Sequence, residues 1–327
     1  MMVPEANMNE DFEVKPTITF DRATFLSKLA TGELADAVDA APTAVVAVDP
    51  TAEALAQADM LDTHGHEEMK RGGFNAARVL YERAVEIRRQ WLGAADPHMM
   101  QSFSWLGSVA LREGRLDEAQ WLYDQARAVA EKKYGAEHPQ VATMLNNLGV
   151  LARRRGDLAL ATDLYKAALA IKLEYLGWQH GSVAATLSNL GRLALASGDL
   201  RDALCHFARA REILEATAGG ASPTLATVLI GMGRVHLQLG MPDTAVWVFE
   251  RALRIREADH VTPAQLADAR LLLAMALTHS EPDRARALVV LGLREYETSA
   301  QPRVEQTAAL QGWLRRLDRH RPMRLAS

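Results

Sequence analysis

The sequence repeats itself every 42 residues, and this period limits the possible folds more than any other feature. Two sets of five glycines follow the period, and each glycine of the second set comes seven residues after one of the first set. The first set is Gly65, Gly107, Gly149, Gly191 and Gly233, and the second is Gly72, Gly114, Gly156, Gly198 and Gly240. A fixed period of this length indicates an array in which one supersecondary unit stacks on the next.

Small and aromatic residues lie in phase with these glycines. An aromatic residue stands four positions after one alanine and three before another, which places all three on one face of a helix. The aromatic positions are Tyr81, Tyr123, Tyr165, Phe207 and Phe249. The alanines before them are Ala77, Ala119, Ala161, Ala203 and Ala245, which the spacing extends to Ala287 in a sixth unit, and those after them are Ala84, Ala126, Ala168, Ala210 and Ala252.

Each unit is predicted to contain two helices. The first begins at Asp96-Pro97, His138-Pro139, His180-Gly181, Ser222-Pro223 and Thr262-Pro263. Asp, Ser and Thr side chains accept an unpaired amide at a helix start, where proline fits as well. The second glycine of each unit ends that helix. One hairpin cannot bury its apolar face alone, so we expect an all-α solenoid of stacked antiparallel hairpins. In the degenerate sixth unit, Met275 and Pro282 fall in the two glycine columns.

This pattern resembles the tetratricopeptide repeat (TPR), with its Leu-Gly pair in the first helix and its small-aromatic-small pattern in the second. The 42-residue unit, with "LNNLG" in the helix and "LGAADPHMM", "YGAEHPQVA" and "LGWQHGSVA" between units, is similar to the kinesin-light-chain type. The resemblance covers about residues 55–297. It implies a right-handed superhelix whose first helices line a concave surface, and a role in protein–protein interaction.

We predict three regions along the chain. Residues 1–50 form an acidic, partly disordered segment with short helices, residues 51–300 form the solenoid, and residues 301–327 form a capping helix and a basic tail. Residues 1–52 carry nine acidic and three basic side chains, whereas residues 301–327 carry six arginines and two acidic residues. A basic end can contact nucleic acid or acidic lipid, but pairing with the acidic segment, or solubility alone, is the preferred explanation.

The composition narrows the functional classes. The formal net charge of −4 argues against nucleic-acid binding, which depends on many cations. One cysteine, Cys205, excludes an intramolecular disulfide and a thiolate metal cage, and favours a reducing compartment, so we expect a cytoplasmic protein. The chain has no secretory signal and no stretch near the roughly 20 apolar residues of a membrane span.

A stripe of residues opposite the packing face of the first helices forms the candidate groove. Asn147 and Arg154 define it in one unit, because Arg154 alone among the three consecutive arginines has the right helical spacing. The predicted peptide-binding residues are Lys70, Trp105, Arg112, Asn147, Arg154, Asn189, Arg192 and Arg234. Asp59 is the one acidic residue of the stripe. Asparagine can pair with an extended backbone, and arginine matches a carboxylate.

We therefore expect a non-catalytic scaffold or adaptor that binds an acidic, partly extended protein segment. Two alternatives stay open. The arginines can be solvated or paired within the chain. The helix dipole favours Lys70, Arg112 and Arg154 near a helix C-terminus whatever they bind, but it does not explain Arg192 and Arg234, which lie mid-helix. The protein can also be a regulator of an enzyme or transcription factor whose N-terminal segment occupies the groove.

No catalytic residue, metal or cofactor is expected. The adjacent Cys205 and His206 point about 100° apart on a helix, so they do not form a nucleophile–base pair. Cys205 is expected to be a structural thiol in a packing helix. His138 and His180 share the position of Asp96 before a first helix, which favours a capping role.

Overall fold

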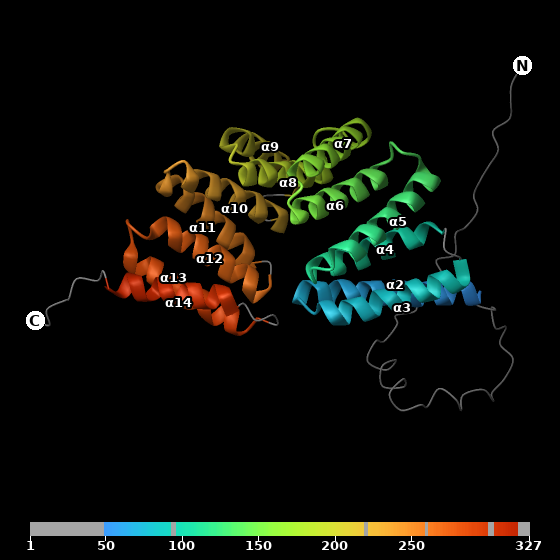
Figure 1. Ribbon diagram of the computed structural model, residues 1–327, viewed down its shortest axis with the longest axis horizontal. Helices are drawn as coiled ribbons and strands as arrows, with labels where there is room; N and C mark the ends of the chain where they lie inside the picture. Colours follow the sequence, from blue (N-terminus) through green and yellow to red (C-terminus); the bar gives the residue numbers. More distant parts are fainter. Residues whose placement is uncertain (1–48, 93–95, 219–221, 259–260, 300–303, 320–327) are drawn as a thin grey trace, which may run out of the picture. The chain divides into compact units, whose positions relative to one another are not determined.

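The computed structural model describes residues 49–92, 96–218, 222–258, 261–299 and 304–319. The predictions for the N-terminal segment before residue 49 and for the basic tail beyond residue 319 therefore lie outside the described residues. Within these ranges the regular structure is entirely helical (Figure 1).

Twelve of the described helices form six hairpins, each made of a first and a second helix. The first helices are α2 (Pro50–Arg71), α4 (Pro97–Arg112), α6 (Pro139–Arg155), α8 (Gly181–Ser197), α10 (Pro223–Gln238) and α12 (Pro263–Leu277). The second helices are α3 (Phe74–Leu92), α5 (Leu116–Tyr134), α7 (Leu158–Leu176), α9 (Leu200–Ala218), α11 (Pro242–Ala258) and α13 (Pro282–Glu297). A final helix, α14 (Val304–Arg319), follows.

The hairpins pack in series. Each first helix packs along the second helix of its own hairpin, and each second helix contacts the first helix of the next hairpin. From α4 to α12, successive first helices also contact one another, so they form a continuous row. This arrangement confirms the prediction of a TPR-like solenoid of helix hairpins (Figure 1).

The predicted helix starts and ends are confirmed in detail. The side chains of Asp96, Ser222 and Thr262 accept backbone amides of the helices that they precede. His138 and His180 do the same through Nδ1, which accepts from amides two residues further on at 3.2 and 3.1 Å. The glycines that end the first helices have φ between 71° and 86°, a left-handed conformation that favours a residue without Cβ.

The other glycine column holds each hairpin together. The aromatic ring of the second helix lies directly against the glycine of the first, and both are buried. A Cβ built on Gly149 would lie 2.6 Å from the Tyr165 ring, and one on Gly191 would lie 2.8 Å from Phe207. In each of the first five hairpins, the glycine thus lets the two helix backbones approach closely, and the aromatic ring fills the space between them.

The sixth hairpin departs from the predicted register. Pro263 follows Pro223 by 40 residues, not 42, so the columns shift by two. Ala287 is exposed and Met275 is 53% exposed, so neither occupies the predicted packing column. The buried residues are instead Leu273, 40 after a packing glycine, and Val289, 40 after an aromatic. A large and a medium side chain replace glycine and an aromatic ring, which keeps the core filled.

The C-terminal end of the array is covered by α14. This helix contacts α13, and its Leu310, Trp313 and Leu314 join the core of the sixth hairpin. Solenoids need such a cap because the last hairpin otherwise exposes an apolar face. None of the described helices is long and apolar enough to cross a membrane.

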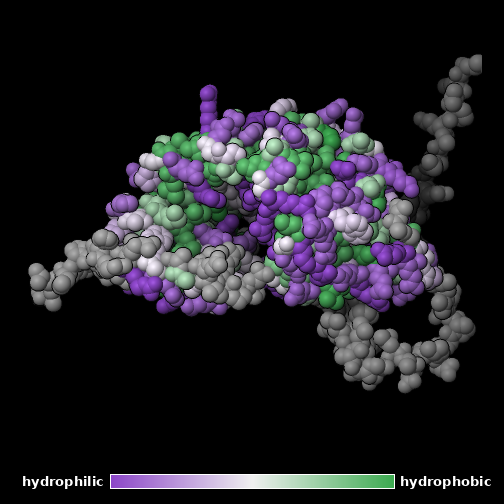
Figure 2. Space-filling model, viewed as in Figure 1, coloured by the Kyte–Doolittle hydropathy of each residue, from purple (hydrophilic) through white to green (hydrophobic). Residues whose placement is uncertain are grey.

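Some apolar side chains remain at the surface of the described hairpins. Figure 2 shows hydrophobic patches among hydrophilic ones over α7–α10. Leu160 and Tyr175 of α7 are 47% and 62% exposed. Cys205 is exposed as well, so the expectation that it packs as a structural thiol is wrong. It lies two residues after the buried Ala203, which places it about 200° around the helix from the packing face.

Candidate peptide-binding surface

The predicted groove residues lie on the row of first helices from α2 to α10. We call the exposed side of this row the first-helix surface. Lys70, Arg112, Arg154, Arg192 and Arg234 are all exposed on it. Trp105, Asn147 and Asn189 are half-buried between neighbouring hairpins.

Arginines from four successive first helices act on one another at this surface. The surrounding protein desolvates the guanidinium of Arg192 on α8 and lowers its pKa, although the side chain is exposed. The positive charges of Arg153, Arg234 and Arg112 lower that pKa further. The four arginines come from α4, α6, α8 and α10, so the chain concentrates like charge at this place.

None of the predicted surface cations forms an ion pair with the part of the chain that the structure describes. The contrast with their neighbour Arg155 is direct. Arg155 turns toward α5 and donates to Asp117 at 2.6 Å and to the carbonyl of Leu116 at 3.2 Å. The pairing within the chain that the sequence left open is therefore observed for Arg155. Arg112, Arg154, Arg192 and Arg234 form no such pair with the described residues.

Arg153 is a surface residue that sequence reasoning missed. Helical spacing left it out of the stripe, because it points about 100° away from Arg154. The residues at the same position of the other units, Met69, Leu111, Leu195 and Leu237, are apolar and gave no signal either. In the structure Arg153 is half-exposed and lies close to Arg192 and to the hydroxyl of Tyr165. Burial raises the pKa of Tyr165, while the positive charges of Arg153 and Arg192 oppose that rise.

The two asparagines connect neighbouring hairpins. Asn147 Nδ2 donates to Ser104 Oγ of the preceding first helix at 3.1 Å. Asn189 Nδ2 donates to Asn146 Oδ1 at 3.0 Å. Each amide thus uses one N–H to hold adjacent first helices in register. Since an asparagine amide has two N–H groups and an acceptor oxygen, the remaining groups can still serve a ligand.

Trp105 has a structural role as well. Its ring stacks on Tyr81 of the first hairpin, with centroids 5.4 Å apart, and meets His66 edge-on at 5.3 Å. The Tyr81 hydroxyl in turn lies 3.3 Å from His66 Nδ1. Trp105 therefore packs the first two hairpins together and presents the rest of its ring to the surface.

Comparisons with known proteins agree with this architecture. Family models described as tetratricopeptide repeat match residues 98–174, 141–216 and 182–258, and another matches residues 65–98. The comparison with curated proteins gives no match.

Solved structures share the fold at low sequence identity. BtubC (BKLC) from P. vanneervenii is 19% identical, with a TM-score of 0.51 over 85% of this chain and 94% of that one. A Rap protein complexed with competence and sporulation factor is 17% identical, with a TM-score of 0.59 over 81% of this chain and 76% of that one. A Podosopora anserina structure of nearly identical TPR-like repeats is 20% identical, with a TM-score of 0.49 over 63% of this chain and 99% of that one.

Proposed function

The chain belongs to the tetratricopeptide repeat family, and from that premise we propose that it is a non-catalytic scaffold or adaptor. Its first-helix surface binds an acidic, partly extended segment of a partner protein. Proteins of this repeat family generally serve as protein–protein interaction modules. We place it in the cytoplasm, because a single cysteine favours a reducing compartment.

One observation supports this proposal most strongly. Four arginines on successive first helices lie close enough for their charges to lower the pKa of Arg192, and the described chain supplies them with no carboxylate. Bringing like charges together costs free energy, and a bound anion relieves that cost. Each guanidinium also presents a planar fork of donors that matches a carboxylate.

The same surface favours a protein segment over nucleic acid. The chain as a whole is acidic, so a duplex would meet repulsion beyond the arginine cluster. Asn147 and Asn189 lie beside the cluster and can pair with the amides of an extended backbone. A structural neighbour, the Rap protein, is found in complex with competence and sporulation factor, which shows that this fold can hold a partner.

The test uses two fluorescently labelled peptides of equal length, one containing a run of glutamates and the other glutamines in their place. We expect the glutamate peptide to bind at least about tenfold more tightly in an anisotropy titration. Replacing Arg153 and Arg192 by glutamine should remove that preference. Equal affinity for the two peptides would overturn the proposal.

A matched control separates the cluster from general charge. Arg254 is an exposed arginine on the second helix α11, so Arg254→Gln changes the net charge without touching the first-helix surface. This variant should bind the glutamate peptide as the wild type does. It is compared with the single variant Arg192→Gln, which removes the same charge, and an equal loss of affinity in the two would show that the arginine cluster has no special role. Far-ultraviolet circular dichroism confirms that each variant is folded.

A second candidate function has its own support in the charge of the N-terminal segment. Residues 1–48 carry eight acidic and three basic side chains, the opposite sign to the arginine cluster. The protein would then be a regulator of an enzyme or transcription factor, with this segment occupying the surface until a partner displaces it. A chain lacking residues 1–48 should bind the glutamate peptide more tightly than the full chain. Unchanged affinity would exclude this candidate.

A further inference from the structure

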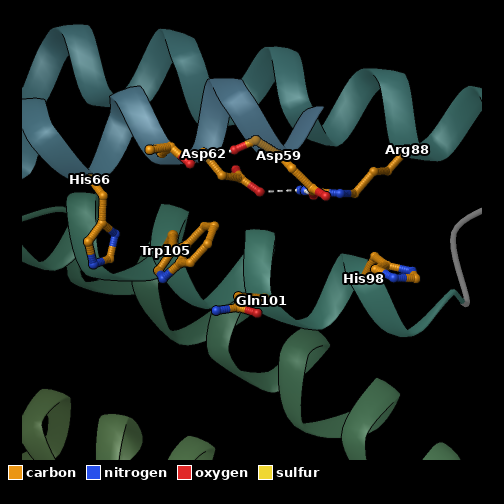
Figure 3. Close-up of a pocket in the computed structure, with 8 residues that line it drawn as sticks. Asp59, Asp62, His66, Arg88, His98, Gln101 and Trp105 are labelled. Atoms are coloured by element: carbon orange, nitrogen blue, oxygen red, sulfur yellow. Dashed lines mark hydrogen bonds and ion pairs between the residues drawn. The ribbon is translucent and has the colours of Figure 1, made fainter. Parts of the chain in front are cut away.

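A cavity of about 400 Å³ lies at the first-hairpin end of the first-helix surface, between α2, α3 and α4. Its walls combine two carboxylates with aromatic and amide side chains. Figure 3 shows Asp59 and Asp62 of α2 meeting Arg88 of α3, with His66 and Trp105 beside each other. This chemistry is the opposite of the arginine cluster on α4–α10.

The cavity contains one negative charge that the described chain does not neutralise. Arg88 donates to Asp62 Oδ2 at 2.5 Å and to Asp59 Oδ1 at 2.6 Å, and it also contacts Ser102 Oγ. One guanidinium thus serves two carboxylates. Burial raises the pKa of Asp62 to about 6, while Arg88 opposes the rise, so this carboxylate is still mostly ionised at neutral pH.

A buried acceptor in the same cavity has no donor. Asp62 is only 4% exposed, and its Oδ1 atom accepts no hydrogen bond from the residues that the structure describes. Leaving a charged oxygen buried and unpaired costs free energy, which a donor brought by a ligand would recover. The Asp59 side chain, which is 70% exposed, places the second carboxylate at the entrance of the cavity.

The opposite wall suits a cation. The Trp105 and His66 rings lie 5.3 Å apart at an angle of 61°, and the indole remains partly accessible. An aromatic face beside carboxylates attracts an ammonium or guanidinium group through both charge and the ring quadrupole. Gln101 adds an exposed amide from the same helix as Trp105.

We propose that this cavity receives a lysine or arginine side chain of the segment that the first-helix surface binds. The inference rests on the proposed function and deepens it. The bound segment then has a basic residue at the α2 end and acidic residues along α4–α10. Since the two charge types lie at fixed places on the surface, the segment can bind in one direction only.

The test compares three peptides with acetylated and amidated ends: the glutamate run alone, the run with an N-terminal lysine, and the run with a C-terminal lysine. General attraction to the arginine cluster would weaken with either lysine, because each lowers the negative charge of the peptide. We expect one lysine peptide to bind about tenfold more tightly than the plain run, and the other to gain nothing.

Asp59→Asn tests the cavity itself. The asparagine oxygen can still accept from Arg88, so the fold should be kept, while the charge at the entrance is lost. This variant should abolish the tenfold lysine-dependent gain and leave the affinity for the plain run unchanged. The control Asp163→Asn, at an exposed position on α7, should preserve the gain.

The outcomes separate the two proposals. If the plain run binds but neither lysine peptide gains, or if Asp59→Asn keeps the gain, the cavity does not receive a basic side chain and the proposed function stands. If the plain glutamate run binds no better than its glutamine counterpart, the proposed function itself is wrong and this inference falls with it.

Discussion

The contacts between successive hairpins are of two kinds, and they alternate along the chain. At each contact, which we call a joint, a residue near the end of one second helix meets a residue near the start of the next first helix. Three joints are polar: Arg88 with Ser102, Lys172 with Thr186, and Arg256 with Asp268. At the other two joints both residues are buried and apolar: Ala130 and Met144 belong to one core cluster, and Leu214 and Val228 belong to another.

The difference between the two kinds of joint is energetic. The residues of the first four joints are all buried, and Arg256 and Asp268 of the fifth are half-buried. At one polar joint, Lys172 is 4% exposed and donates to Thr186 Oγ1 at 2.9 Å and to the Ser182 carbonyl at 3.4 Å. Burial lowers the pKa of Lys172 to about 8, so holding its charge costs free energy. The apolar joint of Leu214 and Val228 has no such cost.

The comparison shows two roles for one structural position. An apolar joint contributes stability in proportion to the surface that it buries. A polar joint contributes little net stability but demands a hydrogen-bonding partner at one place, which restricts the neighbour it accepts. We therefore expect substitutions at the two kinds of joint to respond differently to pH.

The largest effect is expected at the first polar joint. Arg88→Met leaves the buried Asp62 without its counter-charge, and the free energy of unfolding should fall by about 3–5 kcal/mol at pH 7. Urea denaturation measures this loss, which should shrink at pH 5 because the pKa of Asp62, already raised to about 6, then keeps the carboxyl protonated. Arg83→Met, on the exposed side of α3, serves as the control. A pH-independent loss would contradict the assigned role of Asp62.

The apolar joint should lose stability without a pH signature. Leu214→Ala removes a side chain that is 4% exposed, and the free energy of unfolding should fall by about 2–5 kcal/mol. Leu160→Ala, at a position that is 47% exposed on α7, should cost much less. The same urea series from pH 5 to pH 8 should give a constant loss for Leu214→Ala. A loss that varies with pH would remove the distinction between the joints.

The next largest effect is the pH dependence of stability caused by Lys172. It is opposite in sign to the pH dependence caused by Asp62. The folded pKa of about 8 lies below the ordinary value of 10.5, so between these values the unfolded chain binds a proton that the folded chain has released. Raising the pH through this window should therefore stabilise the fold, by up to about 3 kcal/mol. Lys172→Met should lack this rise, whereas Lys166→Met, at an exposed position, should retain it. Parallel pH profiles of wild type and Lys172→Met would contradict the prediction.

The sequence could predict the hairpins because each depends on local chemistry. A cap such as Asp96, a glycine such as Gly156 and a ring such as Tyr165 act within a few residues or at a fixed spacing, so the period alone revealed them. The sixth register was missed because the second helix α11 has 17 residues, two fewer than α9, and nothing in the spacing within one helix reveals where that helix ends. Counting in steps of 42 residues then assigned Met275 to the packing-glycine position and Ala287 to the alanine position of the sixth unit. The residues buried at these positions are Leu273 and Ala285.

The candidate surface was only partly predictable, for a different reason. Helical spacing selected Arg192 and Arg234, and the structure has both exposed on first helices. The same spacing excluded Arg153. In the structure its long side chain lies near Arg192 of the adjacent hairpin, and spacing within one helix does not report such a contact. Asp59 was noticed as the one acidic residue of the stripe, but its partner Arg88 lies 29 residues away on another helix. Such tertiary pairs cannot be derived from spacing within one helix.

The smallest predicted loss of stability tests whether polar and apolar joints differ only at the joint, or also within the hairpins beside it. Gly149 and Gly191 lie inside hairpins on either side of the Lys172 joint. Alanine at either glycine would overlap the facing ring, at 2.6 and 2.8 Å, which costs about 1–3 kcal/mol. Greater helix propensity returns about 1 kcal/mol, so the net loss should be about 1 kcal/mol. Because the interior of the hairpins follows one rule, urea denaturation should give the same loss for both variants.

Gly181→Ala is the control for an unhindered change, since Gly181 is the first residue of α8 and a Cβ there would meet nothing within 4 Å. This control should be neutral or slightly stabilising. A clear difference between Gly149→Ala and Gly191→Ala would mean that the polar joint also changes the packing within its neighbouring hairpins. The two kinds of joint would then differ through strain transmitted along the array, and not only through the free energy of burying a charge at the joint itself.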